Sequence, residues 1–172
     1  SGDCSSVPCT LTINGDKTVT VVFTQLSYAL TTAASPAAGG TVTPASGSVL
    51  SGTVVTVTQT PNAGYTFTGW SGDCTGTGAC SVTMDGAKSV TANYTLNSYT
   101  LTTAANPVAG GTVTPATGSV NHGTVVTVTQ APNAGYTFTG WSGDCTGTGA
   151  CSVTMDGAKS VTANYTLNSY TL

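Results

Sequence analysis

The sequence predicts an all-β protein, organised as small β domains that follow one another in a linear array. A block of 71 residues, 27–97, is followed directly by a second copy, 98–168. Within each block, apolar and polar residues alternate with the period of two that is typical of strands, and no stretch of a dozen residues has helical spacing. Gly, Pro and Asn separate the alternating segments, as expected for turns. We therefore expect several strands per block and minimal helix.

The two blocks are nearly identical in sequence. They differ at seven positions, all in the first half: Ala29/Thr100, Ser35/Asn106, Ala37/Val108, Ser46/Thr117, Leu50/Asn121, Ser51/His122 and Thr60/Ala131. Residues 1–26 match the second half of the block more distantly, and residues 169–172 match its beginning. We therefore expect the C-terminal half of a repeat at 1–26, full repeats at 27–97 and 98–168, and the start of another at 169–172. This organisation indicates a window on a longer array.

The first half of the block is predicted to contain three strands. Residues 28–30 open the first strand, which ends at the Pro- and Gly-containing segment 35–40. Residues 41–43 form a short strand, which the following proline favours at the edge of a sheet. Residues 52–59 form a longer strand with valines on one face, and the Pro-Asn-Ala-Gly segment 61–64 is a turn.

Aromatic residues dominate the next predicted strand. Trp70 breaks the alternation of this strand beside Gly69, so we expect a β-bulge there that turns the indole into the core. One large aromatic residue in a small β unit is more often buried than part of a sugar-binding platform, which is the alternative. The predicted structural core comprises Tyr65, Phe67, Trp70 and Tyr94 in the first full repeat and Tyr136, Phe138, Trp141 and Tyr165 in the second.

The end of the block has the pattern of a β-hairpin. Residues 81–84 and 88–96 flank an Asp-Gly pair, which tolerates the positive φ of a tight hairpin turn. The predicted turn residues are Asn14, Gly15, Asp85, Gly86, Asp156 and Gly157. Two or three residues then separate this hairpin from the next opening strand at Tyr99, so we expect consecutive units to be tightly coupled in an extended rod.

The six cysteines occur as one close pair per unit. A unit of this size buries a small core, and such domains usually carry an additional staple. We predict three local disulfides: Cys4–Cys9, Cys74–Cys80 and Cys145–Cys151. A zinc site is the alternative, but it needs four ligands and each unit offers two cysteines, with a histidine only at position 122. We expect no metal and no cofactor, and the disulfides favour an extracellular location.

Charged residues are scarce. The chain has three Lys, six Asp, no Arg and no Glu, with a net charge of −3. Nucleic acids and anionic membranes are held largely by Lys and Arg, so neither is expected as a partner. About a fifth of the residues are Thr, which suits the solvent-facing side of a sheet. No membrane insertion is expected for this segment, and we expect a neutral, hydroxyl-rich surface.

We expect no catalytic residues. A Ser-His-Asp triad needs a histidine, but the single His122 is replaced by Ser51 in the other repeat, so we expect His122 to be dispensable. Asp73 and Asp85 are the two carboxylates of a unit, and their places beside the Cys loop and in the predicted turn give both a structural role. Asn93 begins an N-glycosylation sequon in the middle of a predicted strand, and the sequence leaves glycosylation of Asn or Thr open.

The second half of the unit resembles a known repeat family. Residues 64–74 read Gly-Tyr-Thr-Phe-Thr-Gly-Trp-Ser-Gly-Asp-Cys, followed by Val-Thr-Met at 82–84 and Lys-Ser-Val-Thr-Ala-Asn-Tyr at 88–94, and the pattern recurs at 135–165. This unit resembles the divergent internalin-type B repeat of bacterial cell-surface proteins. The resemblance implies an exported, β-grasp-like domain in tandem, acting as a stalk or adhesive module without catalytic residues. The residues themselves leave a small sandwich open as the alternative fold.

We therefore expect a non-enzymatic, extracellular tandem-repeat protein that forms a stalk, fibre or adhesive filament on a bacterial surface. Its expected partners are further copies of the same repeat, joined covalently or head to tail. The alternative is a glycan- or protein-binding adhesin module, in which many weak sites act together by avidity.

Overall fold

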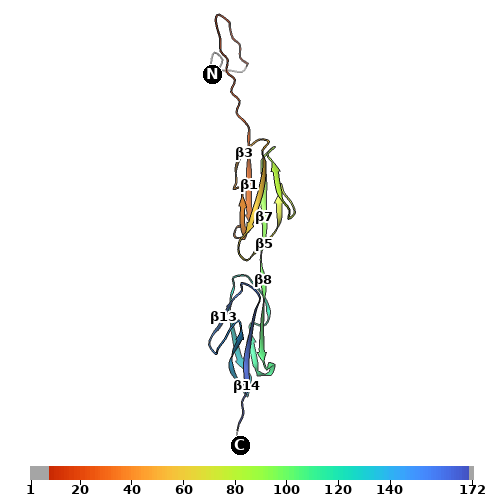
Figure 1. The fold of residues 1–172 in the computed structure, drawn as a ribbon, viewed down its shortest axis with the longest axis vertical. Helices are drawn as coiled ribbons and strands as arrows, with labels where there is room; N and C mark the ends of the chain where they lie inside the picture. Colours follow the sequence, from red (N-terminus) through yellow and green to blue (C-terminus); the bar gives the residue numbers. More distant parts are fainter. Residues whose placement is uncertain (1–7, 171–172) are drawn as a thin grey trace.

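In the computed structural model, which describes residues 8–170, two copies of one β-sandwich lie end to end along the long axis (Figure 1). Each sandwich packs a four-stranded sheet on a three-stranded sheet. The strand orders are β3-β1-β7-β5 and β2-β4-β6 in the first copy, and β10-β8-β14-β12 and β13-β11-β9 in the second. The predicted tandem all-β organisation is therefore confirmed, with the sandwich as its form. A β-grasp needs a helix, and the described residues contain only two 3-10 turns, η1 (Ala37–Gly39) and η2 (Val108–Gly110).

The strands of the two copies correspond one to one. In the first copy they are β1 (Ser27–Ser35), β2 (Gly40–Thr43), β3 (Gly47–Leu50), β4 (Val54–Pro61), β5 (Tyr65–Gly72), β6 (Cys80–Thr83) and β7 (Lys88–Leu96). In the second copy they are β8 (Ser98–Asn106), β9 (Gly111–Thr114), β10 (Gly118–Asn121), β11 (Val125–Pro132), β12 (Tyr136–Gly143), β13 (Cys151–Thr154) and β14 (Lys159–Leu167). The sequence did not predict β3, and it placed β4 two residues too early.

The first and last strands of each unit are neighbours in one sheet. β1 pairs with β7 in parallel, from Leu30 opposite Lys88 to Ser35 opposite Asn93. A parallel pair cannot be joined by a tight turn and needs a crossover connection. Here strands β2 to β6 make up that connection, and three of them form the second sheet. The end of β1 and the start of β7 consequently lie at opposite ends of the pair.

The predicted hairpin at the end of the unit is wrong. β6 pairs with β4, whereas β7 pairs with β1 and β5, so Asp85 and Gly86 connect the two sheets. Gly86 does not have the positive φ that a primed hairpin turn requires. The apolar residues of both strands do face one core, as Val82 and Val90 show, but they face it from opposite sides. Asp156 and Gly157 make the same connection in the second copy.

The described part of the segment before the first full repeat, residues 8–26, has little regular secondary structure. Residues 8–26 contain no strand, and Asn14 and Gly15 form a bend without flanking strands instead of the predicted hairpin turn. The side chains of Ile13 and Phe23 are 73% and 90% exposed. These residues correspond in sequence to the end of a unit, where in the two full repeats such side chains pack against the strands of the first half.

Each sandwich has its own core. Trp70 and Tyr94 are buried, with 7% and 5% of their surface exposed, and Tyr65 and Phe67 pack against them while partly exposed. The ring of Phe67 meets both Trp70 and Tyr94 edge to face, at centroid distances of 5.1 and 5.8 Å. Trp141 and Tyr165 are buried in the second copy, and Tyr136 and Phe138 pack against that cluster.

The predicted bulge lies where Trp70 departs from the alternation. The register of β5 against β7 shifts between Phe67 and Gly69, and Gly69 has a φ of +143°. A single extra residue on one strand turns the next side chain to the other face of the sheet. Gly69 and Trp70 are consequently both buried, although they are adjacent in the sequence.

Replacing Trp70 by Ala is expected to lower the free energy of unfolding of the first unit by about 3–5 kcal/mol, as large core truncations do. Trp141→Ala should do the same to the second unit. Chemical denaturation should then show two transitions, one shifted and one unchanged, because the cores are separate. Val108→Ala is the control: Val108 is 85% exposed, and the first copy has Ala37 there. A single unshifted transition in both Trp variants would contradict the assignment.

Candidate functional site

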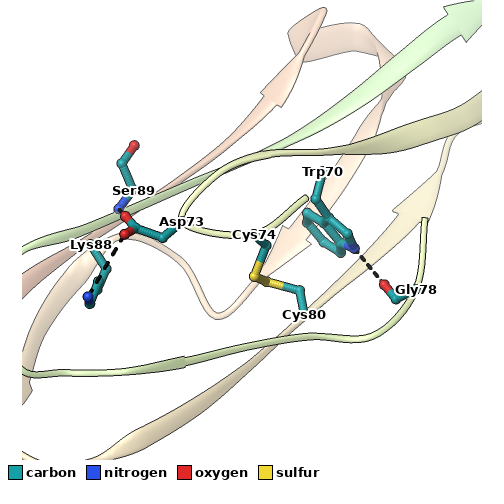
Figure 2. Close-up of a disulfide and its surroundings, with 7 residues drawn as sticks. All are labelled: Trp70, Asp73, Cys74, Gly78, Cys80, Lys88 and Ser89. Carbon is teal, nitrogen blue, oxygen red and sulfur yellow. Dashed lines mark hydrogen bonds and ion pairs between the residues drawn. A yellow bond between two sulfur atoms is a disulfide. The ribbon is translucent and has the colours of Figure 1, made fainter. Parts of the chain in front are cut away.

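The most distinctive cluster of side chains surrounds the disulfide of each unit (Figure 2). β5 ends at Gly72, and the following loop returns to β6 through a disulfide between Cys74 and Cys80. Cys145 and Cys151 form the same bond in the second copy. Two of the three predicted local pairs are thus present. The predicted pairing of Cys4 with Cys9 lies outside the described residues, because these begin at residue 8.

Trp70 is hydrogen-bonded to this loop through both its indole ring and its backbone. Its Nε1 donates a hydrogen bond to the Gly78 carbonyl at 2.9 Å (Figure 2). Its backbone N donates to the Gly76 carbonyl at 2.7 Å. The one polar atom of the ring is therefore satisfied by the loop that the disulfide closes. Because the ring is buried, it presents no face on which a sugar could stack.

Asp73 fastens the same loop to β7. Its backbone N donates to the Ser89 carbonyl at 2.8 Å, and its Oδ2 accepts from the Ser89 backbone N at 2.6 Å. Gly72 has a φ of +93°, and a Cβ at this position would overlap the Ser89 carbonyl. The glycine is thus required for the close approach of the two strands. The carboxylate of Asp73 acts as a structural clamp.

A lysine lies between the two carboxylates of the unit. The Nζ of Lys88 is 2.7 Å from Oδ1 of Asp85 and 3.9 Å from Oδ1 of Asp73. Hydrogen bonding from Lys88 lowers the pKa of Asp85, and the same bond raises the pKa of Lys88. An acid–base pair of the glycosidase type needs one carboxyl group that stays protonated, whereas the ammonium group of Lys88 favours the ionised form of Asp85. Lys159 lies between Asp156 and Asp144 in the same way.

The N-glycosylation sequon is engaged in the fold. The Nδ2 of Asn93 donates to the Gly69 carbonyl and to Oγ of Ser71, both at 3.0 Å. Both amide hydrogens are therefore used to hold the bulge of β5 against β7. A glycan on Nδ2 would remove at least one of these bonds, so this asparagine is a poor acceptor in the folded unit. Asn164 makes the equivalent bonds in the second copy.

A second cluster, which the sequence did not predict, lies at the junction of the two units. Asn97 is the one residue between β7 and β8. Its N donates to the Gly64 carbonyl at 2.8 Å, and its Oδ1 accepts from Oγ1 of Thr66 at 2.6 Å. Its carbonyl accepts from the backbone N of His122 at 2.8 Å. This linker residue is therefore hydrogen-bonded to both units.

Within residues 8–170, no group of three or more His, Cys, Asp or Glu side chains is arranged to hold a metal ion. The same part of the chain has no helix of the length and apolar character needed to cross a bilayer.

Comparison with protein families gives one match, and it covers most of the chain. A model described as the divergent InlB B-repeat domain matches residues 30–98 and again residues 101–169. The two matched segments coincide with the two sandwiches. No curated protein and no solved structure matches.

Reduction of the disulfide is expected to lower the free energy of unfolding of each sandwich by about 2 kcal/mol, because the closed loop restricts the unfolded chain. Thermal unfolding with and without a reductant measures this change. A free-thiol assay on denatured, unreduced protein should find none of Cys74, Cys80, Cys145 and Cys151 reactive. A peptide map that joins Cys74 to Cys145 would overturn the local pairing.

Proposed function

The chain belongs to the divergent InlB B-repeat family, whose repeats are associated with bacterial surface proteins, and we propose that its units form a non-enzymatic extracellular stalk that carries tension. Its partners are further copies of the same repeat. Three features support this role: the order of the strands within a unit, the short linker between units and the near-identity of the two copies.

The parallel pair of β1 and β7 is the observation that carries this proposal. The chain enters a unit at the start of β1 and leaves it at the end of β7. Tension on the chain therefore pulls these neighbouring strands past each other in opposite directions. In this geometry the six residue pairs between Leu30–Lys88 and Ser35–Asn93 share the load, and their hydrogen bonds must break together. Strands that peel apart would break the bonds one at a time, at lower force.

The surroundings of β7 favour the same role. On its other side β7 pairs with β5 over seven residue pairs, from Tyr65–Leu96 to Gly72–Val90. Val90 and Ala92 are fully buried in the core below the strand. The strand that leaves the unit is thus held by two neighbours and by the core. A slip of this strand would disturb all three contacts at once.

The linker and the repetition also fit a stalk. One residue separates β7 from β8, so tension passes from one unit to the next with little slack. The two copies share the same core residues and the same disulfide. A spacer needs many equivalent units, whereas an active site needs one.

A glycan- or protein-binding adhesin module is the alternative. It would require an exposed recognition surface on each unit, and the large aromatic residues are engaged in the cores. Titration of the two-unit protein on a glycan array separates the two proposals, because saturable binding supports the adhesin and its absence supports the stalk.

Ala33→Pro is expected to lower the force at which the first unit unfolds. The backbone N of Thr32 donates a hydrogen bond to Oγ of Ser46 at 2.9 Å, and the Thr32 carbonyl accepts one from the same hydroxyl at 3.2 Å. Ser46 lies on the β3 side of β1. Since backbone groups alternate along a strand, those of Ala33 point toward β7, and proline removes the N–H there. Ala33 is exposed, so the proline ring stays outside the core. Single-molecule pulling should give one weakened peak and one unchanged peak from the second unit.

Ser46→Ala is the matched control for the pulling experiment. It removes hydrogen bonds from the other side of β1 and should lower the equilibrium stability of the unit while leaving its unfolding force close to that of the second unit. Two equal peaks in Ala33→Pro, or an equal loss of force in Ser46→Ala, would refute the shear geometry.

A further inference from the structure

The turn between β10 and β11 places a side chain of the second unit against the first unit. The imidazole of His122 occupies the space beside Gly64, which lies in the turn before β5. A Cβ at Gly64 would overlap Cδ2 and Cγ of this ring. Gly64 is half-buried, whereas its equivalent in the second copy, Gly135, is exposed. The missing side chain of Gly64 therefore leaves a notch that His122 fills.

The ring is held on its other side by its own unit. It meets Tyr99 of β8 edge to face, at a centroid distance of 6.0 Å and an interplanar angle of 63°. Its Nδ1 is buried and has no hydrogen-bond partner among the described residues. The side chain thus acts through packing, and the backbone N of His122 supplies the hydrogen bond to Asn97.

We propose that His122 is an inter-unit contact residue that fixes the orientation of the second unit on the first by filling the notch at Gly64. Ser51 has the equivalent place in the first unit, and its backbone N makes the equivalent bond, to the Leu26 carbonyl at 2.8 Å. A serine is too small to fill such a notch. The choice between His and Ser at this turn consequently sets how stiffly a unit is joined to the one before it. This contact between the units is independent of the proposed function as a stalk.

The occurrence of Ser51 in the other copy predicts that His122 is dispensable. That expectation is reasonable for the folding of a unit, because both residues lie outside the core clusters. It does not extend to the junction, where the two residues differ in the volume that they place against the preceding unit. The exchange of His for Ser is therefore expected to change the coupling between units and to leave the stability of each unit unchanged.

The test measures the distance distribution between spin labels on the two units. Unnatural amino acids at exposed Thr58 and Thr129 carry the labels, which leaves the disulfides intact. The parent protein is expected to give one narrow distribution. His122→Ser should broaden it and leave the melting temperatures of both units unchanged, because serine is the native residue of the other copy. His122→Phe should keep it narrow, since a ring of similar shape still fills the notch.

Two glycine variants provide a matched control. Gly64 and Gly135 lie in identical turns with φ values of +80° and +83°, so an alanine meets the same backbone strain at each. Only at Gly64 would the new Cβ also meet the imidazole, because the nearest atom at Gly135 is Cδ1 of Leu167 at 3.9 Å. Gly64→Ala should therefore alter the distance distribution, and Gly135→Ala should not. Adding Gly64→Ala to His122→Ser should cause no further change.

An unchanged, narrow distribution in His122→Ser would overturn the proposal, as would equal effects of the two glycine variants. Single-molecule pulling of His122→Ser keeps this result apart from the proposed function. The unfolding forces of the two units depend on β1–β7 and β8–β14 pairing and should stay unchanged whether or not the joint has loosened.

Discussion

The parallel pairing of β1 with β7 determines most of the architecture. Parallel neighbours need a long connection, and the intervening strands meet this need by forming a second sheet that covers the first. The pairing also brings the chain in at one end of the sandwich and takes it out at the other. Units can therefore follow one another end to end with a single residue between them. The bulge at Gly69 and the hydrogen bond from Ser89 to Asp73 join β5 and the disulfide loop after it to β7, the second strand of this pair.

The fold class and the buried aromatic residues Trp70 and Tyr94 could be predicted from the sequence, because alternation and its interruption reveal which side chains face the core. The same alternation does not reveal which strand pairs with which. Tyr94 was expected in the core and is buried there, but an Asp-Gly pair fits a hairpin and a connection between sheets equally well. Strand β3 was missed because its Gly-Ser-Val-Leu sequence is short and resembles a turn. The bulge was predictable, because strict alternation would turn the side chain after Gly69 away from the core. Trp70 can be buried beside Gly69 only if the alternation is interrupted there.

The disulfide site could be predicted from spacing alone, whereas the junction could not. A pair of cysteines six residues apart closes a loop whatever the surrounding fold is. The contact of His122 with Gly64 depends on how two folded units are placed, and no local pattern encodes it. One other difference between the copies, Ser46/Thr117, is also explained by the structure. Thr117 keeps the hydroxyl with which Ser46 bonds the first strand, at the same distance of 2.9 Å.

The two separate cores have a consequence for an array under sudden strain. Each hydrophobic cluster is complete within one unit, so the loss of one sandwich leaves its neighbour intact. The disulfide spans only the loop from Cys74 to Cys80, so most of an opened unit is free to lengthen. In the proposed stalk, one unit would therefore unfold under tension and lengthen the chain while its neighbours stay folded, and it would refold when the tension falls.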